Sequence, residues 1–216
     1  MNLKYIIFDF NGTILDDVIV SFEIVQRLAR KYHAKSFTFD EYLDKFSFPV
    51  INYYEALGFD LTKENFAEIS DEFYKTYLAS WKTKTSLAPG IVDLFRLLKS
   101  KKINIYIITA SEEKLLYAQL KHFKLENYID GVAACINNQA KGKKEYGLEF
   151  ITMNHLKPAE GMMIGDTIHD YEVAKHLGVT PILYSKGHNS LKLLMTTKTR
   201  VYRSFADFAD YISTIV

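Results

Sequence analysis

The sequence predicts an α/β protein: a doubly wound parallel sheet with an all-helical insertion near its start. Short apolar runs alternate with stretches of helical periodicity from residue 85 to the end. Residues 4–8 are nearly all apolar, which is typical of a strand buried on both faces of a parallel sheet. Residues 16–84 show helical spacing without strands. We therefore expect a Rossmann-like core of residues 1–15 and 85–216 and a helical cap domain of residues 16–84.

The N-terminal elements follow from periodicity. The strand at residues 4–8 leads into a turn at Asn11-Gly12, and the apolar positions between Val18 and Tyr32 then share one helical face. Helical stretches continue to about Trp81, with breaks at Pro49 and Gly58.

The C-terminal elements alternate regularly. Pro89 suits the start of a helix, and the residues after it form an apolar stripe. The remaining pattern predicts strands at 103–108, 132–136, 162–164 and 180–184 and helices at 112–123, 144–156, 170–177 and 205–212.

Composition excludes several classes of function. The 27 basic and 26 acidic residues nearly cancel, which gives no electrostatic basis for binding nucleic acid or an anionic membrane. Cys135 is the single cysteine, so no intrachain disulfide forms, and its small-apolar surroundings predict a core position. No apolar run approaches the roughly 20 residues of a membrane span, and the N-terminus lacks a signal-peptide pattern. We expect a soluble cytoplasmic protein with a small-molecule partner.

Polar residues stand where three predicted strands end. Asp9 follows the first strand, Thr109 follows strand 103–108, and Gly165-Asp166 follows strand 162–164. Ligands of open α/β sheets bind at this edge. Asp170 lies four residues after Asp166, so a helix begun by Asp166 would project both carboxylates from one side. Three carboxylates around one cleft need a hard cation, and Mg²⁺ is the natural candidate.

Each of these signals also has a structural explanation. An aspartate at a strand end often caps a helix, and a threonine after a strand does the same. Asn11-Gly12 between apolar neighbours is a hairpin-turn signal. The ordered set, with each member at a strand end, favours a site.

The segments DFNGT, IITAS and GDTIHD together resemble the motifs of the haloacid dehalogenase-like hydrolases, and in particular the phosphoglycolate phosphatase-like group with a small helical cap. The resemblance implies that Asp9 attacks phosphorus and becomes an aspartyl-phosphate. It implies that Thr109 binds the transferred phosphoryl group. It also implies that Asp9, Asp166, Asp170 and the backbone carbonyl of Asn11 hold Mg²⁺.

The family also uses a lysine that neutralises the nucleophile and the phosphate. Lys141, Lys143 and Lys144 are candidates, and Lys143 is preferred because it begins a helical stretch. His169 lies between the two metal-site aspartates, where a supporting or exposed position is more typical than a direct role. The other histidines, among them His188, show no ligand spacing.

Asn11 departs from the family pattern, which has a second aspartate there that moves protons. General acid-base catalysis contributes roughly 10²–10⁴ in rate, whereas positioning and charge neutralisation remain. We expect a Mg²⁺-dependent phosphatase of small phosphorylated metabolites with attenuated turnover, and a faster Asn11→Asp variant. The alternatives are a phosphoryl-ligand-binding or regulatory protein without turnover, a haloacid dehalogenase-type hydrolase, and deamidation of Asn11 to a working aspartate.

The cap is expected to select the substrate. Phe46, Phe48, Tyr53 and Tyr54 are candidates for lining the pocket or for forming the core of the cap itself. The sequence does not separate a monomer from a homodimer.

Overall fold

The computed structural model describes residues 2–135 and 142–216, without the side chains of residues 63–65. Its centre is a six-stranded parallel sheet in the order β5-β4-β1-β6-β7-β8. The strands are β1 (Tyr5–Phe8), β4 (Asn104–Glu112), β5 (Gly131–Cys135), β6 (Gly161–Gly165), β7 (Thr180–Tyr184) and β8 (Arg200–Tyr202). The predicted α/β class with a doubly wound parallel sheet is confirmed.

Strand β1 lies in the middle of the sheet and is buried on both faces. Ile6 and Phe8 join one apolar cluster, whereas Tyr5 and Ile7 join the cluster on the opposite face. This alternation follows from the two-residue period of a strand. It explains why the segment is a continuous apolar run, as predicted.

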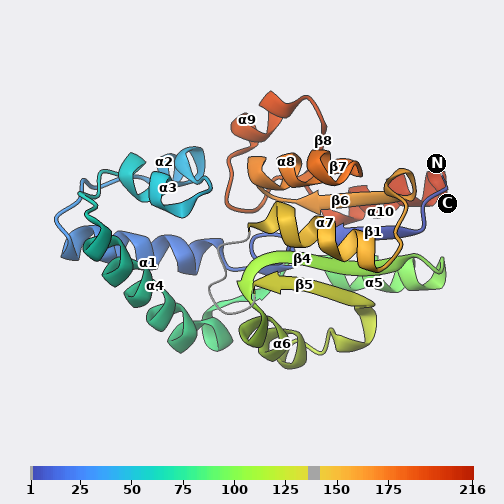
Figure 1. The fold of residues 1–216 in the computed structure, drawn as a ribbon, viewed down its shortest axis with the longest axis horizontal. Helices are drawn as coiled ribbons and strands as arrows, with labels where there is room; N and C mark the ends of the chain where they lie inside the picture. The colour runs from blue at the N-terminus through green and yellow to red at the C-terminus, as the bar shows by residue number, and fades with distance from the viewer. Residues whose placement is uncertain (1, 136–141) are drawn as a thin grey trace.

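Helices cover both faces of the sheet (Figure 1). The first apolar cluster includes residues of α5 (Ile91–Ser100), α6 (Glu113–His122) and α10 (Phe205–Ile215). The second includes residues of α7 (Lys143–Met153) and α8 (Ile168–Leu177). Shorter elements complete this part: α9 (Leu191–Leu194) and the 3₁₀ turns η1 (Glu126–Tyr128), η2 (Pro158–Glu160) and η3 (Met195–Thr197).

Four helices intervene between the first strand and the rest of the sheet, and Figure 1 shows them grouped at one end of the molecule. They are α1 (Val18–Lys31), α2 (Phe39–Lys45), α3 (Val50–Ala56) and α4 (Lys63–Lys84). The chain enters and leaves through β2 (Leu15–Asp16) and β3 (Ser86–Leu87), which pair antiparallel. The four helices have an aromatic-rich core of their own, which includes Tyr42, Tyr53 and Trp81.

Several predicted boundaries were wrong. Helix α5 begins at Ile91 after Gly90, which adopts the left-handed conformation, rather than at Pro89. Strand β4 continues past Ile108 to Glu112, with a register shift against β5. The short strand β8 was not predicted, and Ile136, the expected end of a strand, lies outside the described residues.

The Asn11-Gly12 segment forms a turn but no hairpin with the first strand. Gly12 has a φ of 73°, and its amide donates to the carbonyl of Leu15 at 2.8 Å. Strand β1 pairs instead with β4 and β6. The turn therefore follows the strand at the carboxyl edge of the sheet.

Among the described helices, none combines the length and the apolar character that crossing a membrane requires.

Candidate active site

Asp9 is held at the carboxyl edge of the sheet by its own backbone. It follows β1 directly, and its amide donates to the carbonyl of Ile164 in the neighbouring strand β6 at 2.9 Å. Thr109 lies in β4, the neighbour of β1 on the other side, and is buried. Both line one cavity. Parallel pairing thus brings residues 100 positions apart in the chain to one edge.

Asp166 and Asp170 converge for a different reason from the one expected. Helix α8 begins only at Ile168 with Thr167 as its N-cap, so Asp166 precedes the helix. Asp170 is the third residue of a capping box, and its Oδ2 accepts hydrogen bonds from the amides of Asp166 (3.2 Å) and Thr167 (3.0 Å). The cap, rather than a shared helical face, brings the two acidic residues together.

The carboxylates of Asp9, Asp166 and Asp170 form a buried cluster, with one oxygen from each within 4.8 Å of the others. Glycines make room for it. A Cβ at Gly12 would lie 2.3 Å from Oδ2 of Asp166, and one at Gly165 would lie 2.3 Å from Cγ of Asp170. The Gly-Asp and Asn-Gly pairs of the sequence therefore have a packing role in addition to their turn conformations.

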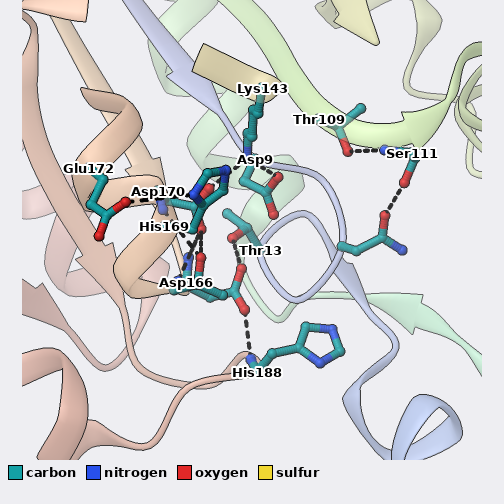
Figure 2. A network of polar contacts seen from close by, with 12 residues as sticks. Asp9, Thr13, Thr109, Ser111, Lys143, Asp166, His169, Asp170, Glu172 and His188 are labelled. Carbon is teal, nitrogen blue, oxygen red and sulfur yellow. Dashed lines mark hydrogen bonds and ion pairs between the residues drawn. The ribbon is translucent and has the colours of Figure 1, made fainter. Parts of the chain in front are cut away.

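Of the lysines that the structure describes, Lys143 reaches this cluster (Figure 2). Its Nζ lies 2.5 Å from Oδ1 of Asp9 and 2.6 Å from Oδ1 of Asp170, and its side chain is 4% exposed. Lys144 points elsewhere and pairs with Glu172 in a largely exposed ion pair at 3.0 Å. Lys141, the remaining candidate, lies outside the described residues.

Burial and charge shift the pKa values in this cluster in different directions. Burial raises the pKa of Asp9 well above its usual value, although Lys143 opposes the shift. Burial, together with the Asp170 charge, raises the pKa of Asp166 to about 6 despite His188 nearby. Burial also acts against ionised Asp170, but Lys143 and Thr167 hold its pKa below the usual value. Asp9 and Asp166 are thus the carboxylates whose charge is least compensated.

The donor set fits a magnesium ion. Three buried carboxylates supply hard oxygen ligands, and one ammonium group does not balance them. Each oxygen of Asp166 receives one hydrogen bond, from the hydroxyl of Thr13 at 2.8 Å and from the amide of His188 at 2.6 Å. A carboxylate oxygen has two lone pairs, so these contacts orient Asp166 and leave capacity for a cation.

The side chain of Asn11 is fully hydrogen-bonded. Its Nδ2 donates to Oδ2 of Asp17 at 2.6 Å and to the hydroxyl of Tyr77 at 2.9 Å. Its Oδ1 accepts a hydrogen bond from the hydroxyl of Ser111 at 2.5 Å. The amide therefore has one orientation, in which its nitrogen faces a carboxylate.

Asp17 and His188 are both buried and were not predicted as site residues from the sequence. Oδ1 of Asp17 accepts from the Gly12 amide at 2.9 Å and lies 3.3 Å from Nε2 of His188. Burial alone would raise the pKa of Asp17, but its hydrogen bonds, first among them that to His188, keep this pKa below the usual value. Burial alone would lower the pKa of His188, whereas Asp17 raises it.

No spacing rule could have found this pair, because 171 positions separate its members and only folding brings them together. Asp17 lies four residues after Thr13, the last residue of motif one, and this nearness in the chain was the available signal. His169 is half-buried, with its ring 4.8 Å from that of Phe48 and no hydrogen bond to the carboxylate cluster among the described contacts.

A cavity of about 1140 Å³ opens between the sheet edge and α1–α4. Asp9, Thr109 and Lys143 line its floor, and Phe46, Phe48, Tyr53 and Tyr54 all contribute to its walls. Tyr53 and Tyr54 are also buried members of the helical core, so both expectations for these residues hold. Cys135 is half-buried and lines the same cavity, so the expected core position was wrong.

Curated proteins similar to this chain include phosphatases. A phosphorylated carbohydrates phosphatase of Thermotoga maritima is 24% identical over 189 residues, which are 83% of this chain and 84% of that protein. A phosphoglycolate phosphatase of Synechococcus elongatus is 23% identical over 197 residues, which are 89% of each chain.

A solved structure shares the fold of this chain, and a family model matches most of its length. A haloacid dehalogenase-like family hydrolase from Streptococcus pneumoniae superposes with a TM-score of 0.84 at 19% identity, covering 98% of this chain and 99% of that one. The family model described as haloacid dehalogenase-like hydrolase matches residues 6–184, a range that contains the strand-end aspartates, Thr109 and Lys143. The resemblance seen in the three motifs is confirmed, and the chain belongs to the haloacid dehalogenase-like hydrolases.

Proposed function

We propose that this protein is a Mg²⁺-dependent phosphatase that hydrolyses small phosphorylated metabolites through an aspartyl-phosphate on Asp9. The contact between Lys143 and Asp9 carries the proposal, because it keeps a buried carboxylate close to a cation at the strand end where the family places its nucleophile. The phosphatases among the relatives support the same class of substrate.

Asp9, Asp166, Asp170 and the backbone carbonyl of Asn11 would hold Mg²⁺. The bound ion supplies charge neutralisation for the phosphoryl oxygens. Oδ1 of Asp170 accepts a hydrogen bond from Lys143, and Oδ2 accepts the hydrogen bond of the helix cap from the Thr167 amide. Asp170 therefore also positions the lysine.

Asp9, Lys143 and Thr109 have separate roles in the remaining chemistry. An oxygen of Asp9 attacks phosphorus, and the bond between phosphorus and the leaving oxygen breaks. Lys143 neutralises the charge on Asp9 and on the phosphoryl oxygens, and the Thr109 hydroxyl binds the phosphoryl group. Water then hydrolyses the aspartyl-phosphate and restores Asp9.

Asn11 cannot supply the proton that the leaving oxygen needs, because its amide does not exchange protons usefully. Water or the substrate itself must provide this proton. Turnover is therefore attenuated most for substrates with poor leaving groups.

The helices α1–α4 act as the cap in this proposal. They form the far wall of the cavity above Asp9, where they exclude water and contact the organic part of the substrate. We predict that this cap comprises residues 16–84 and that the protein is a monomer or a homodimer.

Hydrolysis of p-nitrophenyl phosphate with and without Mg²⁺ tests the proposal. Asp9→Asn should abolish turnover while keeping the fold, because the substitution preserves the shape of the side chain and removes the nucleophile. Asp93→Asn is the matched control, since Asp93 is exposed on α5 and pairs only with Arg96 among the described contacts. Equal activity of Asp9→Asn and the parent would exclude the mechanism.

A phosphoryl-ligand-binding protein without turnover is the second candidate. The engagement of all three polar positions of the Asn11 side chain favours it. Calorimetry that detects phosphometabolite binding in the absence of any hydrolysis would support this alternative. The dehalogenase alternative has less support, because its chemistry needs no cation, and chloride release from a haloacid would test it.

A further inference from the structure

The cavity above Asp9 carries information about the organic part of the substrate. Its walls are largely aromatic, with rings from α2, α3, α4 and the loop between α2 and α3. Phe46 lies 4.7 Å from the ring of His188 and 5.1 Å from that of Tyr53, and Tyr53 lies 5.4 Å from that of Tyr54. A continuous aromatic wall therefore leads from the carboxylate cluster into the helical unit.

Three tyrosine hydroxyls of this wall are engaged by the protein, and that of Tyr53 is buried without a hydrogen-bond partner among the described residues. Tyr77 donates to Asp17 at 2.7 Å, Tyr74 donates to Glu112, and Tyr42 shares a hydrogen bond of 2.9 Å with Nδ1 of His188. These residues consequently present their rings, rather than their hydroxyls, to a ligand. An apolar or aromatic group gains most from such a surface.

The charges of the cavity disfavour a second anionic group on the substrate. Among the described lining residues, the cations are Lys143 and His188. Lys143 is already held by Asp9 and Asp170, and His188 by Asp17. The lining also includes three acidic residues beyond the carboxylate cluster, namely Asp17, Asp71, which is paired with Lys75, and Glu112, which accepts from Tyr74.

A carboxylate or a second phosphate in this cavity would be desolvated beside these acidic residues, and the described part of the chain offers no free cation there to pair with it. We propose that the substrate is a phosphate monoester whose organic part is uncharged and apolar, with an aromatic ring as the best fit. This inference rests on the proposed phosphatase function. It separates the chain from the relative named for phosphoglycolate, a compound that carries a further anionic group.

Four phosphate compounds test this inference at saturating Mg²⁺: 2-phenylethyl phosphate, ethyl phosphate, phosphoglycolate and pyrophosphate. The three esters have alkoxide leaving groups, so reactivity differs less among them than between alkyl and aryl esters. We expect kcat/KM for 2-phenylethyl phosphate to exceed that for each of the others by roughly tenfold or more, the factor that burial of a phenyl group gives. Equal or higher kcat/KM for ethyl phosphate, phosphoglycolate or pyrophosphate overturns the proposal.

Phosphocholine distinguishes an apolar preference from a cationic one, because aromatic rings and acidic residues also recognise quaternary ammonium groups. A preference for phosphocholine over 2-phenylethyl phosphate would overturn the uncharged assignment. Phe48→Ala should lower the ratio of kcat/KM for 2-phenylethyl phosphate to that for ethyl phosphate. Tyr117→Ala, at a half-exposed position of α6 outside the cavity, should leave this ratio unchanged.

A binding measurement keeps this inference separate from the proposed function. Calorimetry of the Asp9→Asn variant with Mg²⁺ reports the order of affinities without turnover. If no compound is hydrolysed by the parent, the phosphatase proposal fails, whereas tighter binding of 2-phenylethyl phosphate than of phosphoglycolate still supports the apolar pocket. The reverse order of binding overturns it.

Discussion

The Nδ2 atom of Asn11 lies 2.6 Å from Oδ2 of Asp17, so a neutral amide occupies the place where a second carboxylate would face a buried one. The same oxygen of Asp17 accepts from Tyr77, and its other oxygen accepts from the Gly12 amide. His188, Tyr77 and Asn11 together keep the pKa of Asp17 below its usual value. The identity of residue 11 is therefore linked to that of residue 17.

This contact changes what is expected of Asn11→Asp. The variant places two carboxylates within hydrogen-bond distance of each other, and we expect it to lower the free energy of unfolding by about 1–3 kcal/mol. The double variant Asn11→Asp/Asp17→Asn removes the facing carboxylate but also the ion pair of Asp17 with His188, so it should recover part of this loss. Urea unfolding of the parent, both single variants and the double variant measures the coupling.

The same four proteins test the catalytic consequence. The double variant should turn over alkyl phosphates at least about tenfold faster than the parent, since it has an acid-base group at position 11 without a facing carboxylate. The gain should be smaller for p-nitrophenyl phosphate, whose leaving group needs no proton. An Asn11→Asp single variant that is as stable as the parent and faster than the double variant would contradict the link.

Lys143→Met should strongly reduce both the stability of the fold and the rate of turnover. It leaves Asp9 and Asp170 buried without their cation, which costs about 3–5 kcal/mol when one partner of a buried pair is removed. Turnover should fall by roughly 10²-fold or more. Lys144→Met is the control, because its exposed pair with Glu172 contributes about 0–1 kcal/mol. Thermal unfolding and kcat of both variants, and of Lys141→Met, decide which lysine serves the site.

Magnesium affinity should depend on pH through Asp166. Its pKa is raised to about 6, so below this value a proton competes with the cation and the apparent affinity should fall by about tenfold per pH unit. Thr13→Val removes a hydrogen bond to the charged carboxylate and should move this transition to higher pH. Calorimetric titration with Mg²⁺ across the pH range measures the affinity of the parent and of the Thr13→Val variant. A constant affinity below about pH 6 would exclude Asp166 as a ligand.

The ion pair of His188 and Asp17 predicts a pH window for stability. The raised pKa of His188 means that its contribution is complete below the ordinary histidine value of 6.5 and is lost as pH rises through the raised value. The lowered pKa of Asp17 means that its contribution is present above 3.8 and is lost as pH falls through the lowered value. The pair therefore stabilises the fold between these limits.

His188→Gln tests this window in Mg²⁺-free buffer. As pH rises above the ordinary histidine value of 6.5, the parent should lose more unfolding free energy than the variant, because only the parent has a histidine with a raised pKa at this position. Urea unfolding at several pH values provides the measurement. Parallel pH profiles of the two proteins would show that the histidine carries no charge in the fold.

Much of the core could be predicted because its signals are local. Tyr5–Phe8 is apolar on both faces, and each following strand is short, apolar and followed by a helical stripe. The short edge strand β8 has no such signal, since three partly exposed residues bury too little to produce a pattern. Boundaries such as Ile91 and Ile168 depend on cap geometry, which a neighbouring proline or aspartate does not determine alone.

The sequence by itself determined the α/β class and the positions of Asp9 and Asp166 directly after buried strands, because the burial period of each element is carried by neighbouring residues. Only the tertiary structure decided that Lys143 reaches Asp9 while Lys144 does not. It also decided that Asp17, His188 and Ser111 surround the Asn11 turn. These contacts join residues far apart in the chain, and their charges and hydrogen bonds act only once the fold has buried them together.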